Sequence, residues 1–267
     1  GPLAGAPVTN PDAMNLDTLM QAAEAYPAWA MLLGLLAVGA GAALQSAVGF
    51  GFALVAAPVL LFIDPRLVPV PITVAALLVT AGNFVLDHRH ADWRGLAWVG
   101  LGNVPGYLAG SLALTLLPVA HMALLFGGLT LSMVGLSISH LHFKPSPRWQ
   151  LPMGALSAFS GVTTSMNGPP VALVYQHAPG PLVRGSLSAY FFISNLVLIG
   201  LFLGLGELDA SALVAGTLLL PGVLLGLWVG RPLASWLDAG RTRRAVLWIS
   251  AVSAVAVMLR YGAPVFR

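Results

Sequence analysis

The sequence predicts an all-α polytopic membrane protein made of two inverted-topology repeats, each with about five apolar segments and a broken or re-entrant helix. Hydrophobic residues make up 58% of the 267 residues and charged residues 8%, whereas soluble domains carry roughly 25% charged residues. The charges gather in short stretches between long apolar runs, and about 20 apolar residues let one helix cross a bilayer. Motifs of the first half also recur at a fixed distance in the second half.

Long runs without any charge define the candidate spans. Asp, Glu, Lys and Arg are absent from seven runs, which are 29–63, 67–86, 95–143, 151–183, 185–206, 210–230 and 245–259. The net charge of +3 therefore comes from the loops. Loop charge of this kind is not the pattern of a nucleic-acid surface, so we expect a lipid bilayer and no nucleic acid as partner. Without cysteine, the chain has neither disulfides nor thiolate metal ligands.

Residues 1–28 are expected to form an N-terminal tail, of which 1–13 resemble a scar or linker left by cloning. Residues 15–28 contain Asp17 and Glu24 but no basic residue. A secretory signal begins with a positively charged region, so these residues do not fit one. We expect a short amphipathic helix at the membrane surface instead.

The first repeat is predicted over residues 29–140. It opens with an apolar helix at 29–49 and a short apolar piece at 51–63 that contains Pro58. A helix as short as this piece spans only about 20 Å, which is less than the bilayer core of about 30 Å. The two pieces therefore predict a broken or re-entrant hairpin. Full spans are then expected at 67–86, 95–117 and 119–139.

The second repeat is predicted over residues 151–262, after a central cytoplasmic linker at 141–150 and before a C-terminal tail at 263–267. It repeats the order of the first, with a helix, a short broken piece and three spans. These five segments are expected at 151–161, 167–176, 183–205, 210–230 and 243–260.

Loop charges orient the chain, because cytoplasmic loops carry an excess of Lys and Arg. The basic loops are those with Arg89 and Arg94, with Lys144 and Arg148, and with Arg231, Arg241, Arg243 and Arg244. The loops at Pro118 and at Glu207 then lie outside, as do both chain ends. An odd number of crossings per repeat inverts the second repeat. Secondary transporters built this way hold their substrate near the midplane, where discontinuous helices meet.

The duplication is visible as pairs of identical residues 112 positions apart. They are Gly49 with Gly161, Pro58 with Pro170, and Asn83 with Asn195. A helix-breaking segment thus stands at the same place in each repeat. Interrupting a helix in lipid leaves backbone N–H and C=O groups unpaired, and a cavity or ligand must satisfy them.

Two half-helix N-termini aimed at the midplane favour an anion, because they carry partial positive charge and free N–H donors. No carboxylate lies in any apolar run, whereas proton relays and metal sites usually need one. We therefore expect a small anionic substrate, no metal and no cofactor. The candidate binding residues are Gln45, Ser46, Gly49, Gly51, Asn83, Ser160, Gly161, Thr163, Thr164, Ser165, Asn167, Gly168, Arg184 and Asn195.

Structural alternatives stand beside this interpretation. Small residues in membrane helices often only permit close packing, and we assign that role to two sets spaced every four residues. These sets are Gly102, Gly106 and Gly110, and Gly222, Gly226 and Gly230. Arg184 can be a plain interfacial residue. A membrane scaffold, an anion channel and a homo-oligomer stay open, but an intramembrane serine enzyme fits poorly, because no histidine follows His177.

Three motifs resemble the TauE/SafE family of sulfite and organosulfonate exporters, and the resemblance covers roughly residues 30–262. They run from Gly49 to Pro58 (GFGFALVAAP), from Gly161 to Pro170 (GVTTSMNGPP) and from Arg184 to Asn195 (RGSLSAYFFISN). The run of three glycines common in the family is absent here. The resemblance implies export of a small sulfur-containing anion, such as sulfite, sulfoacetate or a related carboxylate, across a bacterial inner membrane.

Overall fold

The computed structural model describes residues 27–138 and 144–233, with residues 248, 251–252, 254–256, 258 and 259 near the C-terminus. The described residues form helices and no strand, which confirms the all-α class. In chain order they are α2 (Ala28–Val48), α3 (Phe52–Ile63), η1 (Pro65–Leu67), α4 (Val70–Asp87), η2 (His88–His90), α5 (Trp93–Leu116), α6 (Val119–Ile138), α7 (Pro147–Thr164), α8 (Pro169–Tyr175), α9 (Gly180–Gly204), α10 (Ala210–Leu218) and α11 (Leu220–Leu233).

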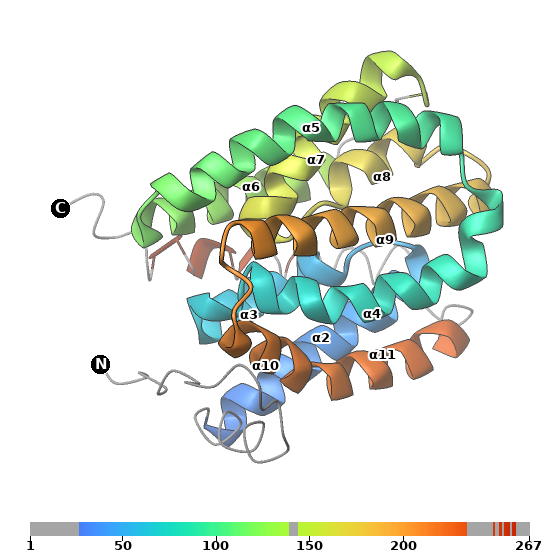
Figure 1. The fold of residues 1–267 in the computed structure, drawn as a ribbon. Helices are drawn as coiled ribbons and strands as arrows, with labels where there is room; N and C mark the ends of the chain where they lie inside the picture. The colour runs from blue at the N-terminus through green and yellow to red at the C-terminus, as the bar shows by residue number, and fades with distance from the viewer. Residues whose placement is uncertain are drawn as a thin grey trace.

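Helices α4 and α9 pack against each other through the middle of the bundle (Figure 1). On one side of this pair α5 lies along α7, and on the other side α11 lies along α2. The short helix α3 packs on α2, and the short helix α8 packs on α7. Each broken pair therefore stays together as two adjacent helices, as the sequence predicts for a hairpin.

Glycines allow the flanking helices to approach closely. A Cβ atom on Gly222 of α11 would lie 2.5 Å from the carbonyl oxygen of Leu35 on α2. On the other side, a Cβ atom on Gly106 of α5 would run into the carbonyl oxygen of Ala155 on α7. Both contacts are impossible for any other residue without a shift of the backbone, so the packing role predicted for the two glycine sets is confirmed.

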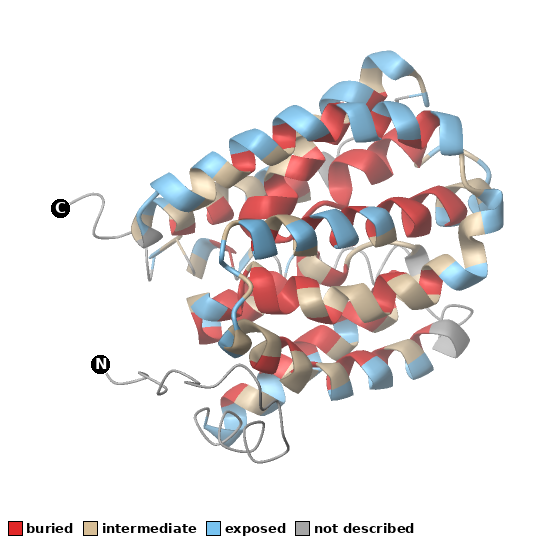
Figure 2. Cartoon of the chain, viewed as in Figure 1, coloured by how far each residue is buried: buried red, intermediate tan, exposed pale blue. Residues whose placement is uncertain are grey.

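The exposed residues lie on the outward sides of the helices (Figure 2), and many of them are large hydrophobic residues, as a lipid-facing surface requires. On α11, for example, Leu224, Leu225 and Trp228 are exposed. Among the described residues, four helical segments are long and apolar enough to cross a membrane, namely Ala28–Ala47, Pro65–His90, Gly180–Gly204 and Ala210–Gly230. The chain is a multi-pass membrane protein.

One predicted helix start is wrong. Helix α7 begins at Pro147, inside the linker predicted at 141–150, because proline is well suited to the first position of a helix. The span predicted at 210–230 is present with these bounds, and a single turn residue within it, Leu219, separates α10 from α11. Pro221 lacks an N–H group and its ring excludes a regular turn before it. Most of the last predicted span, residues 1–26 of the tail predicted at 1–28, and the tail predicted at 263–267 lie outside the described residues.

Different groups lie at the two ends of the bundle. At one end the Tyr175 hydroxyl donates to an oxygen of Asp92 over 3.3 Å, and the Gln150 amide donates to that hydroxyl over 3.3 Å. We call this the inner end, because Asp92 lies between Arg89 and Arg94 in a basic loop that is predicted to be cytoplasmic. The opposite end, called the outer end, contains the segments 61–71, 114–122 and 205–215, several of which line shared cavities.

Candidate functional site

Both predicted helix breaks are present in the structure. Helix α2 ends at Gly49 with φ 96°, and α3 begins after Gly51 with φ 115°. A residue with a Cβ atom rarely adopts these angles, so glycine is needed at the turn. The second break lies between the end of α7 at Thr164 and the start of α8 at Pro169.

The register of the two breaks differs from the predicted offset of 112. The N–H of Gly49 donates to the carbonyl of Gln45, and the N–H of Ser165 donates to the carbonyl of Gly161. The equivalent cap residues are thus Gly49 and Ser165, which are 116 positions apart. Gly161 lies inside α7, about one helical turn before the break. Aligning Gly49 with Gly161 gives the wrong register, because the first helix of the second repeat continues for one more turn before its break.

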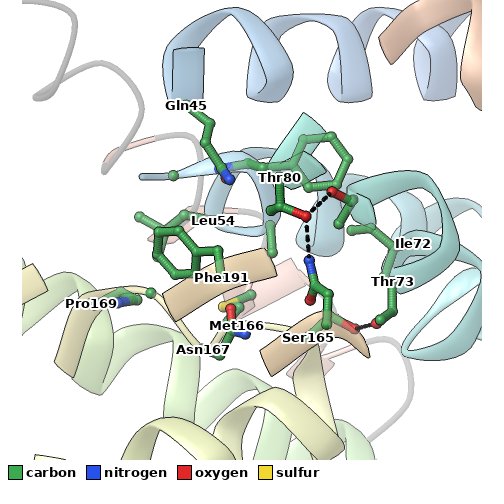
Figure 3. A pocket seen from close by; sticks show the side chains of 16 residues that line it. Gln45, Leu54, Ile72, Thr73, Thr80, Ser165, Met166, Asn167, Pro169 and Phe191 are labelled. Atoms are coloured by element: carbon green, nitrogen blue, oxygen red, sulfur yellow. Dashed lines mark hydrogen bonds between the residues drawn. The ribbon is translucent and has the colours of Figure 1, made fainter. Parts of the chain in front are cut away.

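A central cavity lies between the two breaks, against α4 and α9 (Figure 3). Its volume is about 30 Å³, enough for about two water molecules. None of the residues that line it is ionisable. They are Gln45, Gly51, Phe52, Ala53, Leu54, Ile72, Thr73, Ala76, Thr80, Ser165, Met166, Asn167, Gly168, Pro169, Phe191 and Asn195.

Gln45 connects the end of α2 to the start of α3. Its side-chain oxygen accepts a hydrogen bond from the N–H of Phe52 over 3.2 Å. This bond satisfies one of the unpaired donors at the N-terminus of α3. Because the oxygen is held there, the NH₂ half of the amide is the part that can donate to a ligand in the cavity.

The other amides of the cavity are held by hydroxyl groups. The Asn195 amide donates to the Thr80 hydroxyl over 3.3 Å, which connects α9 to α4. The Asn167 amide donates to the Ser194 hydroxyl over 3.0 Å, which connects the second break to α9. Each amide thus has a fixed orientation before any ligand arrives, which lowers the cost of ordering the site on binding.

The two half-helix N-termini contribute unequally. The first turn of α3, formed by Phe52, Ala53 and Leu54, lines the cavity directly. The first turn of α8 starts with Pro169 and Pro170, neither of which has an N–H group to donate. The sequence analysis expects free N–H donors at both helix starts, and the two prolines leave fewer of them at α8 than at α3.

Six of the predicted binding residues line the cavity, and they are Gln45, Gly51, Ser165, Asn167, Gly168 and Asn195. Eight do not, and they are Ser46, Gly49, Asn83, Ser160, Gly161, Thr163, Thr164 and Arg184. Hydroxyls of this second set fold onto the backbone. Ser160 donates to the carbonyl of Met166 over 2.8 Å and Thr164 to that of Ser160 over 2.6 Å. They shape the second break rather than face the cavity.

The remaining residues of the second set lie nearby. Arg184 is exposed at the inner end, with its backbone and Cγ close to Gly49. Asn83 is buried in α4, one turn past Thr80. Thr163 lines an outer cavity. The Ser46 hydroxyl is buried and has no hydrogen-bond partner among the described residues.

The sequence interpretation missed Thr73 and Thr80, which supply two hydroxyls of the cavity. A signal was available, because these threonines and Asn83 are the polar side chains of the otherwise apolar run at 67–86. It also missed the apolar part of the wall. Phe52, Leu54, Ile72, Met166 and Phe191 line the cavity and give it a hydrophobic side.

No group of three or more His, Asp or Glu side chains that could hold a metal ion occurs in the part of the chain that the structure describes. The cavity can therefore offer a ligand hydroxyl and amide groups, a helix N-terminus and apolar contacts. Neutral donors of this kind suit a small anion or a polar neutral molecule.

Comparisons with known proteins bear on the choice between a small anion and a polar neutral molecule. A family model described as "Sulfite exporter TauE/SafE" matches residues 33–257. The chain is also 29% identical over 248 residues to a probable sulfite/organosulfonate exporter TauE of Cupriavidus necator, a match that covers 85% of this chain and 94% of that relative. No solved structure matches the chain significantly.

Proposed function

Because the chain belongs to the TauE/SafE family of sulfite exporters, we propose that it is a secondary transporter of a small sulfur-containing or organic anion. The cargo is sulfite, sulfoacetate or a similar sulfonate or carboxylate, carried across a bacterial inner membrane by alternating access. The family match supports an exporter. The central cavity supports an anion as cargo.

The observation that carries the proposal is the neutral, donor-lined cavity between the two helix breaks. A hydrogen bond to a charged group contributes about 1.5–3 kcal/mol, and a helix N-terminus adds about 0.3–1 kcal/mol. Amides from Gln45 and Asn195 and hydroxyls from Thr73 and Ser165 can supply several such bonds to one oxyanion. Without a fixed positive charge beside it, the anion is held weakly enough to leave.

The reciprocal packing of the helices supports two inverted repeats. Helix α5, from the predicted first repeat, lies along α7 at the start of the second repeat. Helix α11, from the second repeat, lies along α2 at the start of the first. This exchange is what a two-fold relation between repeats requires. A rocking of one half against the other around α4 and α9 would expose the cavity to each side in turn.

The central cavity is small, with a volume of about 30 Å³. The wall must therefore move outward to admit a sulfonate with a carbon substituent. A movement of this kind fits the alternating-access scheme.

Thermal unfolding of the purified protein with a panel of anions tests the proposal. The panel contains sulfite, sulfoacetate, taurine, sulfate, acetate and chloride, and a ligand present at 100 times its Kd stabilises the folded state by about 2.7 kcal/mol. We expect one sulfur oxyanion, sulfonate or carboxylate to raise the Tm. Stabilisation by no anion would contradict the proposal.

A matched pair of variants locates the binding. Thr80→Val removes a hydroxyl of the cavity, whereas Thr115→Val removes a hydroxyl on the exposed face of α5. The anion should stabilise Thr115→Val as it does the wild type, and Thr80→Val less. An equal response would place the binding elsewhere. Accumulation of the same anion against its gradient in proteoliposomes would distinguish a carrier from a channel.

A further inference from the structure

Three oxygen atoms at the outer side of the central cavity form a triangle. The hydroxyl of Thr73 donates to the carbonyl oxygen of Pro69 over 2.8 Å. The hydroxyl of Ser165 donates to the same carbonyl over 2.8 Å. The two hydroxyl oxygens are 2.9 Å apart, the contact drawn between Thr73 and Ser165 in Figure 3. The triangle joins the start of α4 to the end of α7, which belong to different predicted repeats.

This triangle lies between two spaces. Thr73 and Ser165 line the central cavity. Val68 and Pro69 line two cavities at the outer end, with volumes of about 220 and 290 Å³. Both outer cavities are also lined by Glu207, which is exposed. The segment of Val68 and Pro69 lines the outer cavities, and the two hydroxyls bonded to the Pro69 carbonyl line the central cavity, so these groups lie between the two spaces.

Ser165 holds an unusual backbone conformation at this point. Its φ is 59°, and no other non-glycine residue in the described part of the chain has a positive φ. Such conformations persist only where the surroundings enforce them, and they gather at switch regions. Here the hydroxyl bonded to Pro69 and the end of α7 hold the residue. A change at either contact would release it.

The triangle also has fewer protons than contacts. Each hydroxyl carries one hydrogen, and the Pro69 carbonyl can only accept. Two hydrogens thus serve three oxygen–oxygen contacts, so one contact is always without its own proton. An anion oxygen in the central cavity is a stronger acceptor than a peptide carbonyl, because hydrogen bonds to ionised acceptors are roughly twice as strong as neutral ones.

We propose that Thr73, Ser165 and the Pro69 carbonyl form the outer gate of the transport path, and that the bound anion opens it by taking their hydroxyl donors. The inference rests on the proposed function for its cargo. When the Ser165 hydroxyl turns to the anion it leaves Pro69, which removes the bond between the end of α7 and this segment. The Thr73 N–H still donates to the Pro69 carbonyl, so the start of α4 keeps its helical bond. A substrate that arrives from the inner end thereby loosens the outer wall.

Accessibility tests the gate without any knowledge of the substrate. The chain contains no cysteine, so Ala76→Cys places a single thiol in the central cavity, one turn along α4 from Thr73. A membrane-impermeant thiol reagent added from the outside should label it slowly in the wild-type background. In the Thr73→Val background, which keeps the shape but removes a donor, labelling should be at least tenfold faster.

Two controls accompany this measurement. Thr73→Ser keeps the hydroxyl and should leave the labelling of Ala76→Cys slow, which separates the donor from the packing. Ser211→Cys lies in an outer cavity and should be labelled at the same rate in both backgrounds. Equal labelling of Ala76→Cys with and without the Thr73 hydroxyl would overturn the gate.

A disulfide provides the converse test. The side-chain oxygens of Thr73 and Ser165 are 2.9 Å apart, close to the S–S distance of about 2.05 Å. Whatever transport the reduced double variant Thr73→Cys/Ser165→Cys retains should fall on oxidation and return on reduction, whereas the oxidant should leave each single variant at its own starting level. Transport by the oxidised double variant would also overturn the gate.

The two proposals fail separately. If no anion is transported or bound by any variant, but labelling still depends on the Thr73 hydroxyl, the cargo is wrong and the gate stands. If a sulfonate is transported by wild type and labelling ignores that hydroxyl, the function stands and the gate lies elsewhere.

Discussion

The side-chain amide of Asn195 donates a hydrogen bond to the hydroxyl of Thr80 over 3.3 Å. Asn195 is 6% exposed and Thr80 is 2% exposed, so the bond is shielded from solvent. It joins α9 to α4, the two central helices, at the wall of the central cavity. The same pair of groups can therefore stabilise the bundle and contact the substrate.

A double-mutant cycle should detect the stabilising part. Thr80→Val and Asn195→Leu each remove one partner, and the coupling free energy between them should be about 0.5–2 kcal/mol. It is measured from unfolding of the purified protein in detergent without anion. Strict additivity of the two substitutions would show that the bond adds nothing to stability.

Gln45→Glu should weaken anion binding at least tenfold. The carboxylate still accepts from the N–H of Phe52, so the start of α3 stays capped. The variant loses the NH₂ donor, which is worth about 1.5–3 kcal/mol toward a charged ligand, and an ionised carboxylate would also repel the anion. Titration with the anion that stabilises wild type measures the change. Unchanged affinity with an unchanged Tm of the free protein would remove Gln45 from the site.

Gly51→Ala should destabilise the protein by about 1–2 kcal/mol, the cost of a left-handed conformation for a residue with a Cβ atom. The φ of Gly51 is 115°, and its added Cβ would lie 2.7 Å from a terminal carbon of Leu44. Gly82→Ala in α4 is the control, because no atom lies within 4 Å of its added Cβ. Chemical unfolding compares the two. A Gly51 variant as stable as the control would mean that the first break tolerates another conformation.

Gly106→Ala should destabilise the protein by about 1–3 kcal/mol, the usual cost of overpacking. Its Cβ would meet the carbonyl oxygen of Ala155, which is backbone and cannot turn away. Gly100→Ala lies on the same helix with open space around its Cβ, so it should be neutral or stabilise by up to about 1 kcal/mol. Equal Tm values for these two variants would contradict the packing of α5 on α7.

The sequence predicted the class and the two breaks well because both depend on local composition. Charge-free runs determine where helices can cross lipid, and Gly49 and Gly51 mark a turn that other residues resist. The second break was misplaced by four residues, since its cap is Ser165 with φ 59°. A serine in that conformation is enforced by tertiary contacts, here with Pro69, and no local signal predicts it.

The site was predicted in part for the same reason. Residues next to a break, such as Gln45 and Asn167, were found because the break itself is visible in the sequence. Thr73 and Thr80 were missed because hydroxyls inside apolar helices usually bond to their own backbone, and both of these also do so. Only the packing of α4 against α9, and the contact of Thr73 with Ser165 after the end of α7, place them at the cavity.

The exchange of partners between the halves has a consequence for how the chain is made. During synthesis α2 enters the membrane before α3 to α10 are made, yet its packing partner α11 is translated only after them. Until then the small residues Gly39 and Ala43 on α2 face lipid instead of the glycines of α11. The N-terminal half must therefore wait in a provisional arrangement, and assembly can be completed only when both halves are present, whether on one chain or as two fragments made side by side.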